Sequence, residues 1–252
     1  MVSESLAEDT YGDISMTRNL LYRDNIAINK FVSVYIPTIG EILDNEDEYY
    51  SMVSLFTATP VDYLVQLDDV GIDFTTINEW QMFLLFFNGL KTRDCHLVLG
   101  ELDLTKFNIG VNEQNGNVVL MDTENDIRID QEIHAQIANA LRKIHHLEKN
   151  RRKPANDDAK KYMLERARKK LKRRQRKVED SQLESLIIAM VNTEQFKYDF
   201  EGTRELSIYQ FNESVRQIIK KVDYDNRMYG IYAGTVNAKD LNPDDLNWLI
   251  HK

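Results

Sequence analysis

The chain has 252 residues, of which 42% are hydrophobic and 10% aromatic, enough for one large or two small globular domains with a packed core. It has only ten glycines and four prolines, a composition that excludes a disordered chain and favours helices over a sandwich or barrel. Cys95 is the single cysteine, so no intrachain disulfide can form, which predicts a reducing cytoplasmic compartment and a small buried apolar role for Cys95.

Charge is distributed unevenly along the chain. The formal net charge is -9, yet residues 151–177 carry 14 basic and 3 acidic side chains, residues 1–150 carry 10 and 25, and residues 178–252 carry 8 and 13. A low isoelectric point alone argues against a polyanion partner, but a segregated basic segment marks a candidate interaction surface. The stretch AKKYMLERARKKLKRRQRK at 159–177 is therefore central to any interpretation.

Apolar spacing and capping residues predict the first elements. Residues 1–28 are expected to be a loose N-terminal arm without the basic and apolar regions of a secretory signal. A strand ended by Pro37 is predicted within KFVSVYIPT at 30–38. A helix should follow, because Thr38 and Glu41 have the spacing of a capping box and an apolar face continues to Phe56.

Two further helices are predicted before residue 91. Thr59 is expected to cap the first, with Pro60 at the favoured initial position. Thr76 and Glu79 form a second capping-box pattern ahead of WQMFLLFFNGL at 80–90. This apolar window is much shorter than the ~20 residues that span a bilayer, so it predicts a buried helix and no membrane partner.

The period then changes from helical to alternating. FNIGVNEQNGNVVLMD at 107–122 predicts two strands around Asn115 and Gly116, because both residues tolerate the positive φ of a type I′ turn. Asp130 is expected to cap the next helix. The predicted fold class is therefore α+β, predominantly helical, with a small antiparallel β-hairpin sheet in the N-terminal half, and residues 29–149 form one α+β domain.

The remaining chain is predicted to be helical. Residues 150–180 form a linker and a basic helix, with Asn156 as the helix cap. Residues 181–252 form a C-terminal helical domain, in which Ser181 begins a separate helix and Ser207 caps the next one. The sequence DLNPDDLNWL predicts a last short helix.

No spacing of residues indicates catalysis or a cofactor. The glycines show no phosphate-binding pattern, and the acidic run from Asp122 lacks the glycine and glutamate of a calcium loop, since Ile127 and Ile133 stand there. His145 and His146 are adjacent and point to different helix faces, unlike paired zinc ligands. We therefore expect no catalytic residues, no metal, no cofactor and no enzymatic activity.

The basic segment is predicted to be an exposed helix whose charges do not cluster on its apolar side. One narrow apolar stripe contains Met163, Leu164, Ala167, Leu171 and Val178. The candidate partner-binding residues project from the other faces and are Arg166, Lys169, Lys170, Arg173, Arg174 and Lys177.

Three surfaces could neutralise these charges. The first is the acidic remainder of the same chain, or of a copy in a homo-oligomer, around a solvated helix. The second is an acidic or helical protein partner, with the apolar stripe as anchor and the cations as steering charges. The third is nucleic acid, which is disfavoured because Tyr162 is the only aromatic residue near the cations.

Several stretches resemble a known group of proteins. They are IGEILDNEDEYYSMVSLFTATPVDYLVQLDDVGIDF, FNIGVNEQNGNVVLMDTENDI, AMVNTEQFKYDF and SIYQFNESVRQIIKKVDYDNRMYGIYAGTV. Together they resemble uncharacterised proteins encoded in tail-morphogenesis modules of bacteriophages that infect low-GC Gram-positive bacteria. The resemblance spans most of residues 30–250 and rests on core and turn residues, without diagnostic chemistry.

The resemblance implies a non-enzymatic morphogenesis factor of the tail-assembly chaperone type, whose partner is a helical phage tail protein. The alternatives are a minor structural protein of the tail or baseplate, and a nucleic-acid-binding accessory protein that uses the basic helix. The expected location is the cytoplasm of the bacterial host, or the virion if the protein is structural.

Overall fold

The computed structural model describes residues 20–22, 25–113, 115–174 and 181–249. In chain order its elements are β1 (Ile26–Ala27), β2 (Ser33–Val34), α2 (Ile39–Asp44), α3 (Glu46–Thr57), α4 (Leu64–Asp69), α5 (Glu79–Leu90), α6 (His96–Leu99), η1 (Leu104–Lys106), β3 (Asn108–Val111), β4 (Val118–Asp122), β5 (Ile127–Ile129), α7 (Gln131–His145), α8 (Asp157–Arg174), α9 (Gln182–Val191), α10 (Phe200–Arg204), α11 (Ile208–Tyr232), η2 (Ala238–Asp240) and η3 (Pro243–Leu246).

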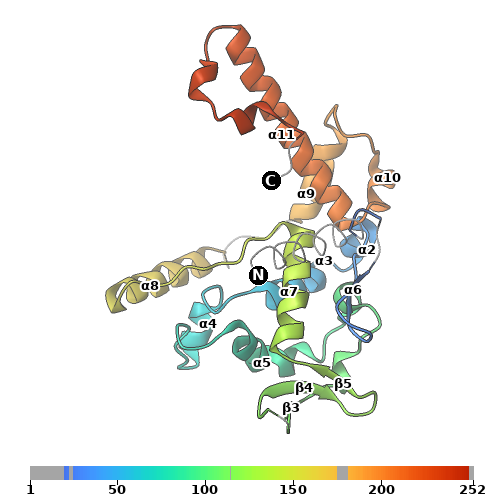
Figure 1. The fold of residues 1–252 in the computed structure, drawn as a ribbon, viewed down its shortest axis with the longest axis vertical. Helices are drawn as coiled ribbons and strands as arrows, with labels where there is room; N and C mark the ends of the chain where they lie inside the picture. Colours follow the sequence, from blue (N-terminus) through green and yellow to red (C-terminus); the bar gives the residue numbers. More distant parts are fainter. Residues whose placement is uncertain (1–19, 23–24, 114, 175–180, 250–252) are drawn as a thin grey trace, which may run out of the picture.

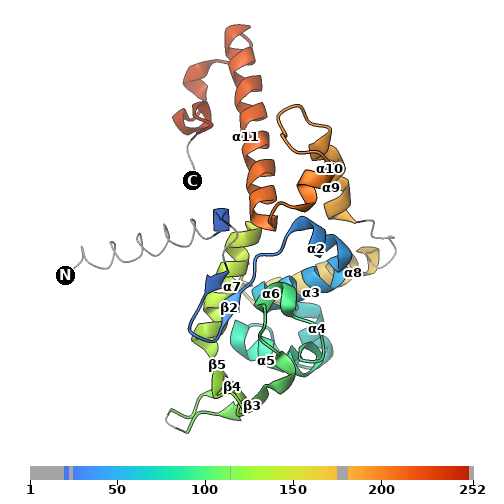
Figure 2. The ribbon, with the colours of Figure 1, turned by 90° about the vertical axis from the view of Figure 1, so that its right-hand side faces the viewer.

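These elements form an elongated molecule with a helical centre (Figures 1 and 2). Helices α3 and α7 lie in the middle, and the β3-β4-β5 sheet lies at one end. Helix α11 projects from the opposite end, and α8 leaves the body sideways. The predicted fold class, α+β and predominantly helical with a small antiparallel sheet in the N-terminal half, is confirmed.

The sheets are small and antiparallel. Strand β4 pairs with β3 and with β5, in the register Ile109↔Leu120↔Ile129. The predicted hairpin is therefore correct, but the type I′ turn is wrong. The loop runs from Asn112 to Asn117, where Asn112 N donates to Asn117 O at 2.8 Å, and of its Asn-Gly pair only Gly116 has a positive φ, at 72°. The longer loop lets glycine alone adopt the left-handed conformation.

Four of the predicted helix caps are confirmed. Thr38 caps α2 in a capping box with Glu41, and Asp130 caps α7 by accepting from two backbone amides. Ser181 caps α9, and Ser207 caps α11 in a capping box with Gln210.

Other helix starts differ from the prediction. Thr59 does not cap a helix, because its backbone N–H and hydroxyl both donate to Asp62 in a turn, and α4 begins only at Leu64. Asn78 caps α5 in place of Thr76, in a capping box with Gln81. The predicted long helix after Thr38 is divided between α2 and α3, and of the strand predicted over 30–38 only Ser33–Val34 is strand.

The main core lies between α3 and α7. Phe56 of α3 is buried beside Phe83 of α5, with 4.9 Å between ring centroids, and both lie close to His134 of α7. Tyr49 of α3 bonds through its hydroxyl to His145 Nε2 at 2.8 Å. Large aromatic side chains therefore supply much of the buried apolar area that holds the helices together.

The C-terminal helices share this core at their inner ends. Leu183 and Ile187 of α9 and Ile208 and Phe211 of α11 belong to the same buried cluster as the N-terminal elements. Leu20 is also buried in it. The boundaries predicted at 29–149, 150–180 and 181–252 stay predictions. Within the predicted arm at 1–28, residues 1–19 and 23–24 lie outside the described structure.

A second buried cluster lies beside the first. Its members are Ala58, Leu64, Val65, Leu67, Phe74 and Met82, which come from α4, α5 and the loops next to them. Helix α8 rests on this cluster, and α8 also contacts α4. Among the described helices none is long and apolar enough to cross a bilayer.

Candidate functional site

The basic helix α8 begins where the sequence predicted. Asn156 accepts a hydrogen bond from Ala159 N through Oδ1 at 2.8 Å, which satisfies one of the free amides of the first turn. Asp157 and Asp158 also lie in this turn, where negative charge suits the helix dipole. The helix is described as far as Arg174.

The apolar stripe of α8 faces its own chain. Leu164, Ala167 and Leu171 are partly buried against the second cluster. These side chains therefore hold α8 to α4 and α5, and they cannot also anchor a partner as the sequence interpretation suggested. Met163 is half-buried, and Val178 lies outside the described residues.

Two cations of α8 are neutralised within the chain. Lys160 Nζ lies 2.5 Å from Asp73 Oδ2, and Arg168 Nη2 lies 2.7 Å from Asp68 and 2.6 Å from Asp69. The hydrogen bond from Lys160 is the main reason that the pKa of Asp73 falls to about 2. The hydrogen bonds to Asp68 and Asp69 raise the pKa of Arg168. Neutralisation by the same chain thus applies to these two cations.

Besides Lys161 and Lys172, four other cations of α8 are exposed and have no ion pair or hydrogen bond with any described residue. Helical spacing places them on one face, opposite the stripe that packs on α4. We call this face the basic ridge, and its members are Arg166, Lys169, Lys170 and Arg173. Of the other two predicted site residues, Arg174 is described only by its place at the end of α8, and Lys177 lies outside the described residues.

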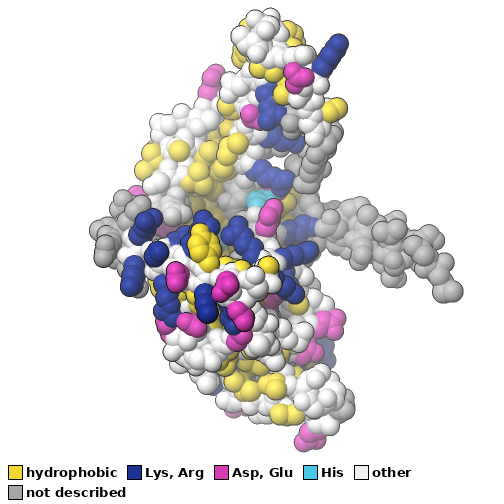
Figure 3. All heavy atoms as spheres, turned by 90° about the vertical axis from the view of Figure 1, so that its left-hand side faces the viewer, with side chains coloured by type: hydrophobic (Ala, Val, Ile, Leu, Met, Phe, Trp, Pro, Cys, Tyr) yellow, Lys and Arg dark blue, Asp and Glu magenta, His cyan; other side chains and the backbone are white. Residues whose placement is uncertain are grey.

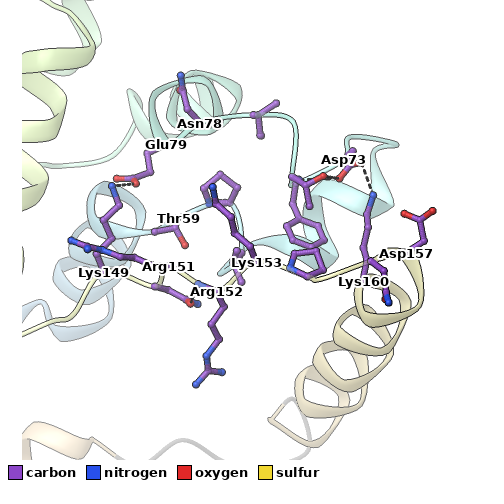
Figure 4. Close-up of a pocket in the computed structure, with 18 residues that line it drawn as sticks. Thr59, Asp73, Asn78, Glu79, Lys149, Arg151, Arg152, Lys153, Asp157 and Lys160 are labelled. Carbon is purple, nitrogen blue, oxygen red and sulfur yellow. Dashed lines mark hydrogen bonds and ion pairs between the residues drawn. The ribbon is translucent and has the colours of Figure 1, made fainter.

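A cavity of about 740 Å³ adjoins the start of α8 (Figure 4). It lies between the α4–α5 loop and the linker that leads from α7 to α8. Lys149 pairs with Glu79, and Asn150 Nδ2 donates to Asp62 Oδ1 at 2.8 Å. Together with the pair between Lys160 and Asp73, these contacts fasten the linker and the start of α8 to the helical body.

Three linker cations were not predicted as site residues. Arg151, Arg152 and Lys153 line the cavity and are exposed. In Figure 4, Lys153 points between Thr59 and Asn78, whereas Arg152 points away from them. The charge count over 151–177 already contained these residues, so their membership of a basic surface was available from the sequence. The position of these residues beside a cavity could not be read from the sequence.

The residues considered for metal or nucleophilic chemistry have structural partners. Asp122 accepts hydrogen bonds from Asn125 Nδ2 and from the backbone amides of Glu124 and Asn125, which lower its pKa. Cys95 is buried, as predicted, and burial raises the pKa of its thiol. Within the described part of the chain no three His, Cys, Asp or Glu side chains are grouped so that they could hold a metal ion.

Comparison with known proteins gives one similarity. Residues 172–251 match the model of the YomV second domain, which has a phage-type family name. The match runs from the last residues of α8 to residue 251, so it covers α9, α10 and α11 but not the N-terminal elements. No curated protein and no solved structure matches the chain. The similarity points to a phage-related protein.

Proposed function

We propose that the chain is a non-enzymatic tail morphogenesis factor of a bacteriophage, an assembly chaperone that holds an acidic, helical tail protein on the basic ridge. The observation that supports this proposal is the division of α8 into two faces. One face packs on α4, and the other presents Arg166, Lys169, Lys170 and Arg173, which have no ion pair or hydrogen bond with a described residue. The phage-type similarity of residues 172–251 agrees with it.

The ridge is suited to an anionic surface for an electrostatic reason. The pairs Arg166/Lys170 and Lys169/Arg173 are four residues apart, and each like-charge pair of this kind destabilises a helix by about 0.2–0.5 kcal/mol. Carboxylates of a partner would relieve this repulsion and would speed association by steering. The packed stripe and the ion pairs of Lys160 and Arg168 hold α8 in place, so a partner meets a preorganised surface.

The test reverses ridge charges and compares them with a matched change on the same helix. Lys169→Glu/Arg173→Glu changes the ridge, whereas Lys161→Glu/Lys172→Glu changes two exposed cations that lie off it. Both variants should keep the melting temperature of the wild type within about 3 °C, because exposed charges contribute little to stability. The ridge variant should capture tail proteins from phage-infected cells far more slowly at low salt, and the control variant should not.

Equal capture by the two variants and the wild type would contradict the proposal. Mass spectrometry of purified virions separates the alternatives, since a chaperone should be missing from particles and a minor tail or baseplate protein should be present. Tyr162 has 64% of its surface exposed on α8, close to the ridge cations, which is the observation that favours nucleic acid. Salt-dependent binding of DNA or RNA that requires the ridge and Tyr162 would support that function instead.

A further inference from the structure

Helix α11 has a face that starts in the core and continues into solvent. Phe211 is fully buried and meets Phe196 with 6.0 Å between ring centroids. Val215, Ile219 and Val222 follow it at intervals of four, four and three residues, which places them on the same face of the helix. Val215 is half-buried, but Ile219 is 63% exposed and Val222 is 38% exposed. We call these three residues the apolar strip.

The described C-terminal segment covers a different side of α11. Gln217 Nε2 donates to Trp248 O at 2.9 Å, and Lys221 Nζ lies 5.5 Å from the centroid of the Trp248 ring. Gln217 and Lys221 are two residues before Ile219 and two residues after it, so they point away from the strip. Among the residues that the structure describes, the C-terminal segment therefore leaves the apolar strip uncovered although it folds back along α11.

The strip lies on α11 and the basic ridge on α8, and Figure 3 shows a face of the molecule on which hydrophobic and basic side chains lie one above the other. In Figures 1 and 2, α8 lies between α4 and α9 along the length of the molecule. Because the packed face of α8 is turned to α4, the ridge is turned toward the end that holds α9 and α11. Figure 3 shows hydrophobic side chains gathered between α9 and α11, directly above the Lys and Arg side chains of α8. Ile188 of α9 is also exposed, at 49%.

We infer that the apolar strip of α11 and the basic ridge of α8 form one docking site for an amphipathic helix with an aliphatic face and a carboxylate-rich face. This inference rests on the proposed function and deepens it. It supplies the apolar anchor that Leu164, Ala167 and Leu171 cannot provide, because those side chains are packed on their own chain. The strip contacts the aliphatic face of the partner, and the ridge pairs with its carboxylates.

Charge complementarity favours such a partner over helix α11 of a second copy of the chain. Helix α11 of another copy carries four basic and three acidic side chains, so it would not present a carboxylate-rich face to the ridge. The ridge of that copy would also repel the first ridge.

The probe for a test is a labelled helical peptide of about 20 residues, with leucine on one face and glutamate elsewhere, long enough to present three heptads. Controls are a scrambled peptide of the same composition and a peptide with lysine in place of glutamate. Fluorescence anisotropy at low salt should show saturable binding of the first peptide only. Ile219→Ser/Val222→Ser should weaken binding about tenfold or more, as expected for apolar anchors. Leu85→Ser, which changes a 51% exposed leucine of α5, should leave binding unchanged.

The remaining outcomes separate this inference from the proposed function. If Lys169→Glu/Arg173→Glu weakens binding but the strip variant does not, the inference fails and the proposed function stands. If only the strip variant weakens binding, both fail. The inference is also overturned if the scrambled peptide binds equally well, if the acidic peptide does not bind, or if sedimentation shows a dimer of the wild type that Ile219→Ser/Val222→Ser dissociates. Ile219→Ala replaces the serine variant if circular dichroism shows that the latter is unfolded.

Discussion

His134 shows how a single polar residue fits into the aromatic core. Its ring lies between Trp80 and Phe83, at centroid distances of 5.4 Å and 4.5 Å, and its Nε2 has no hydrogen-bond partner in the structure described here. Burial lowers its pKa to about 4, because a charged imidazole would lose its hydration. His145 is partly buried beside Tyr49, and loss of hydration lowers its pKa to about 4 as well.

Because the pKa values of these two histidines are lowered in the folded chain, we expect the protein to lose stability at mildly acidic pH. Above their ordinary pKa of 6.5 both folded and unfolded chains hold them neutral, so stability is complete. As the pH falls from 6.5 toward 4, the unfolded chain binds protons that the folded chain does not, and each histidine lowers the free energy of unfolding by up to about 1.4 kcal/mol per pH unit.

Urea titrations at several pH values would measure this dependence. His134→Leu should reduce the slope between pH 6.5 and 5 without abolishing it, since His145 and His146, whose pKa values burial also lowers, remain. It should also raise stability at pH 7 by about 1 kcal/mol, because an unsatisfied buried polar atom is removed. Asp73, whose pKa is lowered from 3.8 to about 2, loses its contribution to stability mainly below about pH 5, so the slopes are compared above that pH. An unchanged slope in the variant would contradict the assignment.

Arg142 is a second single residue that we expect to contribute to the stability of the fold, because its hydrogen bonds are buried. Its guanidinium donates to Thr57 O at 2.6 Å and to Glu79 Oε2 at 3.1 Å, and its side chain is only 8% exposed. Arg142→Leu should lower the free energy of unfolding by about 1–3 kcal/mol, because the Thr57 carbonyl loses its donor, although Glu79 keeps its pair with Lys149. The matched control is Arg93→Leu, whose pair with Glu48 is 3.8 Å long and exposed, and whose loss should cost less than about 1 kcal/mol. Chemical denaturation of both variants checks the difference.

At the scale of elements, a helix cap was predictable where one side chain accepts hydrogen bonds from the backbone N–H groups of the first turn. Ser207 is such a residue and is fully buried, where it also forms an isolated bridge with Thr38. The helix caps predicted at Thr59 and Thr76 were wrong for a local reason. The hydroxyl groups of these threonines donate instead to Asp62 and to the carbonyl of Asp73, in turns. A threonine can bond to a nearby aspartate or backbone carbonyl as well as cap a helix, and the sequence does not decide between these uses.

Ser207→Ala should therefore weaken the junction between α11 and the core. The hydroxyl accepts from Gln210 N at 3.2 Å, and loss of such a cap lowers stability by about 1–2 kcal/mol. Asn237→Ala removes the cap of the short, exposed element η2 and should change stability by less than about 0.5 kcal/mol. Equal melting temperatures of the two variants would show that the Ser207 cap contributes no more to stability than the Asn237 cap.

At the scale of the whole molecule, the inner ends of α9 and α11 are buried with α3 and α7. This shared core predicts one cooperative unfolding transition, although the composition suggested units at 29–149 and 181–252. Differential scanning calorimetry should give a calorimetric enthalpy equal to the van't Hoff enthalpy. Two resolved transitions would show that the C-terminal helices unfold separately.

The sequence by itself determined the fold class, the hairpin, the caps at Thr38, Asp130, Ser181 and Ser207, and the basic helix. Each of these depends on residues close together in the chain, because capping and hydrophobic periodicity are local properties. The sequence also showed that the basic segment differs from the rest of the chain in charge.

Only the tertiary structure decided which face of α8 is free. Leu164 and Leu171 were available either for a partner or for the chain's own core, and their contacts with residues about 100 positions earlier settled the choice. Arg168 and Lys160 were neutralised by Asp68, Asp69 and Asp73, which no local spacing connects to them. The basic ridge is what remains after this packing, because long-range contacts depend on how the whole chain folds.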